Sequence, residues 1–273
     1  MRIAVGDMMY DVRVHGPEDG RPVLLLHGFP QTIRSWTAVA ERLVAAGCRT
    51  IAPDQRGYSP GARPLEVAAY GMRPIVDDTV GLLEALGLPT VDVVGHDWGA
   101  NVGWLLASWH PDRVRSLTAV SVPHPAAFGW AFRHDVEQQQ KSSYMALFRL
   151  PGKAEEVLLA DGGRRLRRIL EGGDIPEDAI DGYVAHLSVP GALTAALNWY
   201  RAMGRADLDG PVTVPTTYVW STADIAVGRV AAQRCAEHVA ADYRFVELDG
   251  ISHWIPEQAP DALAEAVLAR LAS

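Results

Sequence analysis

An aspartate between two glycines, in the segment Val-Gly-His-Asp-Trp-Gly-Ala, is the most chemically suggestive feature of this chain. An apolar, strand-like run at 90–94 leads into the segment, and a helical pattern at 100–110 follows it. A strand, a Gly-x-nucleophile-x-Gly turn and a helix form the sharp turn that lifts one side chain above a sheet. Gly95 and Gly99 lack a Cβ, so strand and helix can close tightly around a strained residue. The pattern predicts that Asp97 is a nucleophile.

Two alternatives compete with this prediction. Ser59 lies in a second match to the motif, but no helical pattern follows it, and Pro60 lacks the N–H that the turn needs. Asp97 could instead serve only as a helix N-cap, since aspartate favours that position. The histidine and second acid described next favour a catalytic Asp97.

A carboxylate nucleophile requires a particular chemistry. It is ionised at neutral pH, since the aspartate pKa is ordinarily ~3.9, and it suits displacement at an sp3 carbon to give an alkyl-enzyme ester. Hydrolysis of that ester needs a water activated by a histidine that an acid orients. His253 follows the last predicted strand, and Asp224 follows the strand-like run at 216–220. Asp249 is the rival acid, but it ends a predicted strand and is expected to satisfy turn amides.

Backbone amides complete the predicted site. The segment His-Gly-Phe-Pro follows a strand-like run at 22–26 and turns so that the Phe29 N–H, together with the Trp98 N–H, can stabilise an oxyanion. His27 and His96 are expected to hold turns through hydrogen bonds. The other histidines show no metal-ligand spacing, and no phosphate-binding glycine loop is present, so we expect neither metal nor other cofactor.

Composition excludes several classes of partner. The 273 residues are 48% hydrophobic and 21% charged, which is typical of a soluble globular protein, and the net charge of −8 argues against nucleic-acid or anionic-membrane partners. No signal-peptide pattern and no apolar stretch of ~20 residues appear, so a cytoplasmic enzyme is expected. The one basic cluster, which is expected to be a solvated helix face, comprises Arg164, Arg165, Arg167 and Arg168.

The elements that position these residues alternate between strands and helices along most of the chain. This alternation predicts an α/β fold with a mostly parallel sheet flanked by helices. Between Pro123 and Pro211 helical stretches dominate and no clear strand appears. We therefore expect a helical cap at 124–210, inserted into a core formed by 1–123 and 211–273.

Four segments together resemble the α/β-hydrolase-fold epoxide hydrolases, along essentially the whole chain: His27-Gly-Phe-Pro-Gln31, Asp54-Gln-Arg-Gly-Tyr58, Gly95-His-Asp-Trp-Gly99 and Ser252-His-Trp254. Each segment alone is weak, but the set is specific. The resemblance extends into the cap, where Tyr144 and Tyr200 lie in segments similar to those that carry the family's two epoxide-binding tyrosines. Met145 departs from the family, in which Gln is frequent at this position.

The resemblance implies an enzyme that converts an epoxide to a vicinal diol through an ester on Asp97. Tyr144 and Tyr200 would hold the epoxide oxygen and protonate the alkoxide, since phenols with a pKa near ~10 are neutral at pH 7. The small-molecule partner is expected to be an apolar or aromatic epoxide, and a homodimer is compatible with the sequence. The predicted substrate contacts are Phe128, Phe148, Trp199 and Trp254.

Two other functions fit part of the pattern. A haloalkane-type dehalogenase would share the aspartate and histidine, with Trp98 donating to the halide. Phe29, however, stands where such enzymes often place a second donor, and paired phenols suit oxygen better. A non-catalytic ligand-binding protein on a hydrolase fold is disfavoured by the complete set of nucleophile, acid, base and amides.

Overall fold

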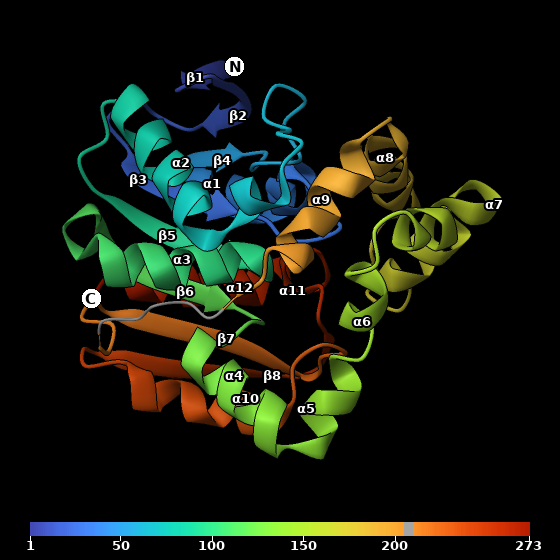
Figure 1. The fold of residues 1–273 in the computed structure, drawn as a ribbon. Helices are drawn as coiled ribbons and strands as arrows, with labels where there is room; N and C mark the ends of the chain where they lie inside the picture. Colours follow the sequence, from blue (N-terminus) through green and yellow to red (C-terminus); the bar gives the residue numbers. More distant parts are fainter. Residues whose placement is uncertain (205–209) are drawn as a thin grey trace.

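The computed structural model describes residues 1–204 and 210–273, and within them one twisted sheet forms the centre of the molecule (Figure 1). The sheet has eight strands in the order β1-β2-β4-β3-β5-β6-β7-β8. Strands β3 to β8 run parallel, whereas β1 and β2 are antiparallel to their neighbours. The predicted mostly parallel sheet is thus confirmed. The strands are β1 (Arg2–Val5), β2 (Met8–His15), β3 (Arg21–Leu26), β4 (Cys48–Pro53), β5 (Val91–His96), β6 (Val114–Val120), β7 (Thr216–Ala223) and β8 (Tyr243–Ser252).

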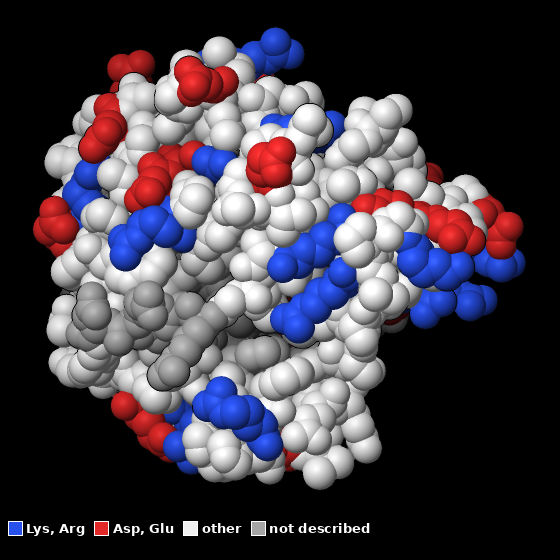
Figure 2. Space-filling model, viewed as in Figure 1, with Lys and Arg blue, Asp and Glu red and all other residues white. Residues whose placement is uncertain are grey.

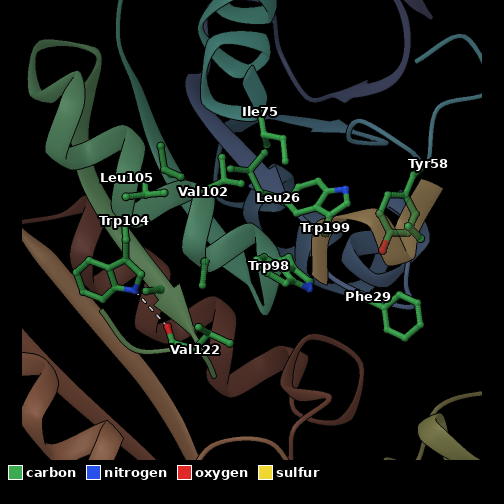
Figure 3. Packing of buried hydrophobic residues seen from close by; sticks show 14 of the residues in the cluster. Leu26, Phe29, Tyr58, Ile75, Trp98, Val102, Trp104, Leu105, Val122 and Trp199 are labelled. Atoms are coloured by element: carbon green, nitrogen blue, oxygen red, sulfur yellow. Dashed lines mark hydrogen bonds between the residues drawn. The ribbon is translucent and has the colours of Figure 1, made fainter. Parts of the chain in front are cut away.

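Helices cover both faces of the sheet, which explains why its central strands are buried and largely apolar. Alternate residues of β3 enter two different cores, with Leu24 and Leu26 in one and Val23 and Leu25 in the other. Figure 3 shows the first core, where side chains of α3 pack near Leu26. Helices α2 (Met72–Ala85) and α3 (Trp98–Trp109) contribute to that core, and α1 (Thr37–Ala45) and α12 (Pro260–Leu271) to the second.

Short helices connect the larger elements. The described residues include η1 (Ile33–Trp36), η2 (Val67–Tyr70), η3 (Pro111–Arg113), α10 (Arg229–Gln233), η4 (Arg234–His238) and α11 (Ile255–Gln258). The helical stretch between β7 and β8 is divided into α10 and η4. No helix among the described residues is long and apolar enough to cross a membrane.

Six helices lie between β6 and β7, where the described residues contain no strand. Helix α4 contacts α10 and η4 beside the sheet, whereas α6 to α9 project to the right in Figure 1. We call α6 to α9 the cap helices. The expected cap range of 124–210 contains 205–209, which lie outside the described residues, so its limits stay a prediction. The six are α4 (Pro125–His134), α5 (Val136–Lys141), α6 (Met145–Phe148), α7 (Lys153–Leu170), α8 (Glu177–Ser188) and α9 (Ala192–Arg201).

Strand β8 continues to Ser252, beyond Asp249, where the sequence predicted its end. A register shift opposite β7 accommodates the extra residues, and Gly250 adopts a φ of 69° there. The Thr222 hydroxyl donates to Asp249 at 2.9 Å and accepts from the Gly250 N–H at 2.8 Å. This irregular end brings the loop after β8 to the same edge as the ends of β5 and β7, because all three strands are parallel.

Candidate active site

Asp97 occupies the turn between β5 and α3, in a conformation that few residues adopt. Its φ is 53° and its ψ is −119°, and such strain in a non-glycine residue is characteristic of functional turns. A Cβ on Gly95 would overlap the backbone of Gly99, and one on Gly99 would overlap the backbone of Leu26. The Asp97 side chain makes no N-capping hydrogen bond, so capping does not account for this residue.

The carboxylate of Asp97 is held from the β3 side of the sheet. The Phe29 N–H donates to its Oδ1 at 2.8 Å. The neighbouring Gly28 lies so close that a Cβ there would overlap the same carboxylate. The two amides predicted to form an oxyanion site, those of Phe29 and Trp98, therefore both lie at Asp97, since a hydrogen bond from the Trp98 amide contributes to its pKa.

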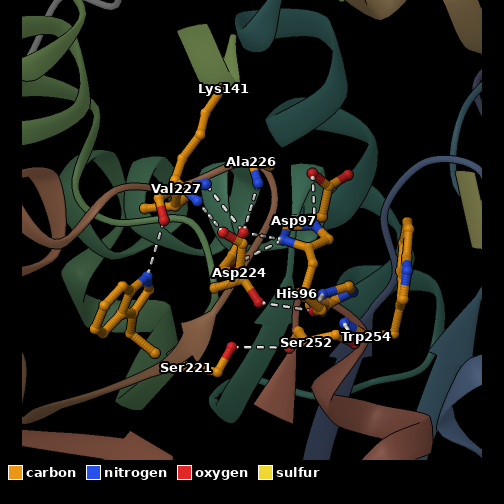
Figure 4. A network of polar contacts seen from close by, with 12 residues as sticks. His96, Asp97, Lys141, Ser221, Asp224, Ala226, Val227, Ser252 and Trp254 are labelled. Carbon is orange, nitrogen blue, oxygen red and sulfur yellow. Dashed lines mark hydrogen bonds and ion pairs between the residues drawn. The ribbon is translucent and has the colours of Figure 1, made fainter. Parts of the chain in front are cut away.

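His253 connects Asp97 and Asp224, which Figure 4 labels, in the arrangement expected of a base. Its Nδ1 lies 2.9 Å and 3.0 Å from the two carboxylate oxygens of Asp224, and its Nε2 lies 3.5 Å from Oδ2 of Asp97. All three side chains are buried. Three residues from the ends of three different strands thus meet at one edge of the sheet.

The rival acid lies elsewhere. Asp249 accepts from the Thr222 hydroxyl, whereas Oδ1 of Asp224 accepts from the Ala226 N–H at 2.7 Å and the Val227 N–H at 2.9 Å. These two bonds fix the Asp224 carboxylate against the imidazole. The geometry therefore agrees with the choice of Asp224 as the orienting acid.

Two residues that the sequence analysis did not single out hold the loop that carries Asp224. Lys141 donates from Nζ to the carbonyl of Asp224. The fully buried Gln138 donates to the Ala226 carbonyl at 2.8 Å and accepts from the Gly228 N–H at 2.9 Å. Both belong to α5, in a run Val-Glu-Gln-Gln-Gln-Lys whose polarity gives no sign of a buried role.

Two other histidines, His96 and His27, form hydrogen bonds with backbone carbonyls and are not placed to act as catalytic bases. His96 donates from Nε2 to the His253 carbonyl at 2.8 Å, and His27 donates from Nδ1 to the Gly28 carbonyl at 3.1 Å. Burial lowers the pKa of each to about 4, so both rings are neutral at pH 7. The Ser121 hydroxyl makes a second hydrogen bond to the His253 carbonyl, at 3.0 Å.

The charges of the three central residues are interdependent. Burial alone would raise the pKa of Asp97, but the hydrogen bond and charge of His253 outweigh it, and the pKa is lowered. Burial would lower the pKa of His253, but the charges and hydrogen bonds of Asp224 and Asp97 raise it to about 10. In the free protein at pH 7 a cationic imidazole therefore lies between two carboxylates.

A cavity of about 930 Å³ opens above Asp97 and His253. Tyr144, immediately before α6, and Tyr200, on α9, both line it, with ring centres 6.2 Å apart. Burial raises the pKa of both phenols, and the charge of Asp97 raises it further, so both are neutral at pH 7. The described residues contain no group of three or more His, Cys, Asp or Glu side chains that could hold a metal ion.

Two of the four predicted substrate contacts, Phe148 and Trp254, line this cavity, whereas the other two do not. Trp199 packs against Trp98 and donates its indole N–H to the Arg56 carbonyl at 2.9 Å, which places it beneath the cavity wall. Phe128 stacks on Phe132 within α4, a helix that packs beside the sheet. Aromatic character indicated burial but not direction, and substrate contact by Phe128 and Trp199 stays a prediction that the cavity lining does not support.

The basic cluster on α7 also lies differently from the expectation. Arg164, Arg165 and Arg168 are exposed but line the cavity. Arg167 points to another side, where it pairs with Glu177 at 2.8 Å and with Asp181. The expectation of a solvated helix face is thus incomplete, since Arg164, Arg165 and Arg168 are exposed but line a cavity, and Arg167 is half-buried in ion pairs.

The fold and this site define an α/β hydrolase. The sequence profile of the alpha/beta hydrolase fold family matches residues 21–171. An AB hydrolase superfamily protein, YfhM of Bacillus subtilis, is 35% identical over 94% of this chain and 92% of its own length. Epoxide hydrolase A of Mycobacterium tuberculosis is 34% identical over 93% of this chain and 92% of its own.

Solved structures agree with these relatives. An epoxide hydrolase from a hot-environment metagenome superposes with a TM-score of 0.88 at 28% identity, over 99% of this chain and 97% of that one. The chain therefore belongs to the epoxide hydrolase family of α/β-hydrolase-fold proteins.

Proposed function

We propose that this protein hydrolyses an epoxide to a vicinal diol through an ester on Asp97. The observation that carries the proposal is the meeting, in one cavity, of a carboxylate, a histidine that can activate water, and two neutral phenols. The names of the relatives support the same reaction. We further infer that the cap helices supply the substrate-facing roof of the site, because Tyr144 directly precedes α6 and Tyr200 lies on α9.

In the first step Asp97 attacks an epoxide carbon. The two carboxylate oxygens are not equivalent, since Oδ1 already accepts from the Phe29 N–H while Oδ2 faces His253. Oδ2 is therefore the attacking oxygen, and Oδ1 becomes the ester carbonyl. As the ring opens, the Tyr144 and Tyr200 hydroxyls hydrogen-bond to the departing oxygen and one of them transfers a proton to it. Without these donors, negative charge would develop in a buried cavity at a high cost.

In the second step water attacks the ester carbon. His253, oriented by Asp224, removes a proton from the water, and negative charge moves to Oδ1. The Phe29 amide already donates to this oxygen and the Trp98 amide donates to the same carboxyl group, so both are in place to stabilise the tetrahedral intermediate. Collapse breaks the bond from Cγ to the diol oxygen, which takes up the proton held by His253. The second proton of the water leaves the new carboxyl group and replaces the one that the tyrosine gave up, so that the Asp97 carboxylate and both phenols are restored.

The dehalogenase alternative is less well supported by the contacts of Trp98. Burial raises the pKa of Tyr200, although a hydrogen bond from the Trp98 side chain lowers it somewhat. The indole N–H that a halide would need is therefore directed at a phenol. A comparison of styrene oxide with a bromoalkane, scored by diol and by bromide release, separates the two activities.

The decisive experiment follows the oxygen atoms. A single turnover in ¹⁸O-labelled water should place the label in the Asp97 peptide, because water attacks the carboxyl carbon rather than the epoxide. In His253→Gln the ester should accumulate, and mass spectrometry should find the substrate mass on that peptide. An unlabelled Asp97 peptide, or an adduct on another residue, would contradict the mechanism.

A further inference from the structure

The cavity above Asp97 has a charged side that the proposed reaction does not use. Helix α7 departs from helical geometry at Ala160–Gly163, and the turns after this break present Arg164, Arg165 and Arg168 to the cavity. Figure 2 shows basic side chains gathered over α7, at the right of the view. The whole chain carries a net charge of −8, so this concentration of cations contrasts with the rest of the molecule.

Ion pairs neutralise some, but not all, of the charged residues of α7 that line the cavity. Asp161 pairs with Arg164 at 2.6 Å, and Glu156, the other acidic residue of α7 that lines the cavity, pairs with Lys153 at 3.1 Å. Arg165 and Arg168 have no ion-pair partner within residues 1–204 and 210–273. They are three positions apart on the same helix, so their side chains lie on neighbouring parts of one face. Two guanidinium groups thus remain available to a ligand.

Apolar side chains share the cavity with both the catalytic residues and these arginines. Leu147, Val157, Leu158 and Ile169 line it. A ligand that fills the cavity would therefore place its reactive end at Asp97, an apolar portion along these residues and a polar end at the arginines. Guanidinium groups match carboxylate oxygens in geometry as well as charge.

On the basis of the proposed function, we infer that the natural substrate is an epoxide whose apolar chain ends in a carboxylate, which Arg165 and Arg168 bind at the cavity rim. Both arginines are specificity-determining residues that do not touch the reacting atoms. Because they are exposed, their attraction to the carboxylate is moderate and weakens as salt is added.

The test compares terminal epoxides of carboxylic acids of increasing chain length with their uncharged methyl esters. At low salt, kcat/KM for the acid should exceed that for the ester of the same length, and added salt should reduce the ratio. In R165Q/R168Q the acid-to-ester ratio should fall about fivefold, as expected for the loss of two exposed ion pairs. The matched control is R167Q, on the same helix but paired with Glu177 and Asp181, which should keep the wild-type ratio.

A ratio of one or less in the wild type would overturn the inference, as would an equal fall in R167Q. Styrene oxide, which carries no charge, separates this failure from a failure of the proposed function. If styrene oxide and every acid and ester resist hydrolysis, the proposed reaction is wrong. Calorimetric binding of the diol acid and of its methyl ester then still decides the role of the arginines, because this comparison needs no turnover.

Discussion

The charge on Asp97 should control whether His253 is an acid or a base. The Nε2 of His253 lies 3.5 Å from a carboxylate oxygen of Asp97, and both side chains are buried. At an effective dielectric constant of about 20, a pair at this separation interacts by about 5 kcal/mol, which corresponds to a change in pKa of about 3.5. Asp97→Asn keeps the shape of the side chain and removes this charge. The pKa of His253 should therefore fall from about 10 to about 6.5.

Nuclear magnetic resonance titration of the imidazole nitrogens measures this change, with His253→Gln used to assign the signal. Asp249→Asn is the matched control, since it removes an acidic charge at the end of β8 that contacts Thr222 instead of His253. A His253 that still titrates near 10 in Asp97→Asn would refute the coupling, as would an equal fall in the control.

Formation of the ester removes the same charge as this substitution does. His253 should therefore be a cation while Asp97 attacks and a neutral base once Asp97 is alkylated, without movement of either residue. Where ester hydrolysis limits the rate, kcat should rise as the pH increases through about 6.5, because deprotonation of His253 makes it a base.

Two further variants test the tyrosines above the cavity and the loop that carries Asp224. In Tyr144→Phe/Tyr200→Phe, kcat/KM should fall by about a thousandfold because the departing oxygen loses both hydrogen-bond donors. The control Tyr183→Phe removes a phenol that is bound to Glu257 outside the cavity, and it should retain activity. Equal losses in the two variants would mean that Tyr144 and Tyr200 only pack in the cap. Gln138→Leu should lower the free energy of unfolding by about 2–4 kcal/mol, measured in urea, and lower kcat, because groups of the Asp224 loop lose buried partners. The control Gln140→Leu, at an exposed position of the same helix, should change neither the free energy of unfolding nor kcat. A wild-type kcat in Gln138→Leu would show that the contacts of α5 do not affect catalysis.

Some parts of the site are predictable from sequence because they depend on local constraints. The turn at Asp97 needs small residues on both sides, and the parallel strands bring the loops that carry Asp224 and His253 to one edge. The fold follows from the same alternation of strands and helices. These features depend on residue type and order, which the sequence states directly.

Other parts depend on direction in space, which residue type does not determine. Trp199 and Tyr200 are adjacent on α9, yet one lies beneath the wall and the other lines the cavity. Arg167 and Arg168 diverge in the same way, because successive residues on a helix point about 100° apart. The roles of Gln138 and Lys141 were not predictable, since they depend on where α5 meets a loop far along the chain.

The contacts of α5 have a consequence for engineering. This helix lies between β6 and β7, in the inserted part of the chain, yet its side chains form hydrogen bonds with the loop that carries Asp224. A chimaera that takes its cap helices from one relative and its sheet and flanking helices from another would need compatible residues at positions 138 and 141. Exchanges that begin after Lys141 should preserve this junction, and those that begin at the end of β6 would require it to be rebuilt.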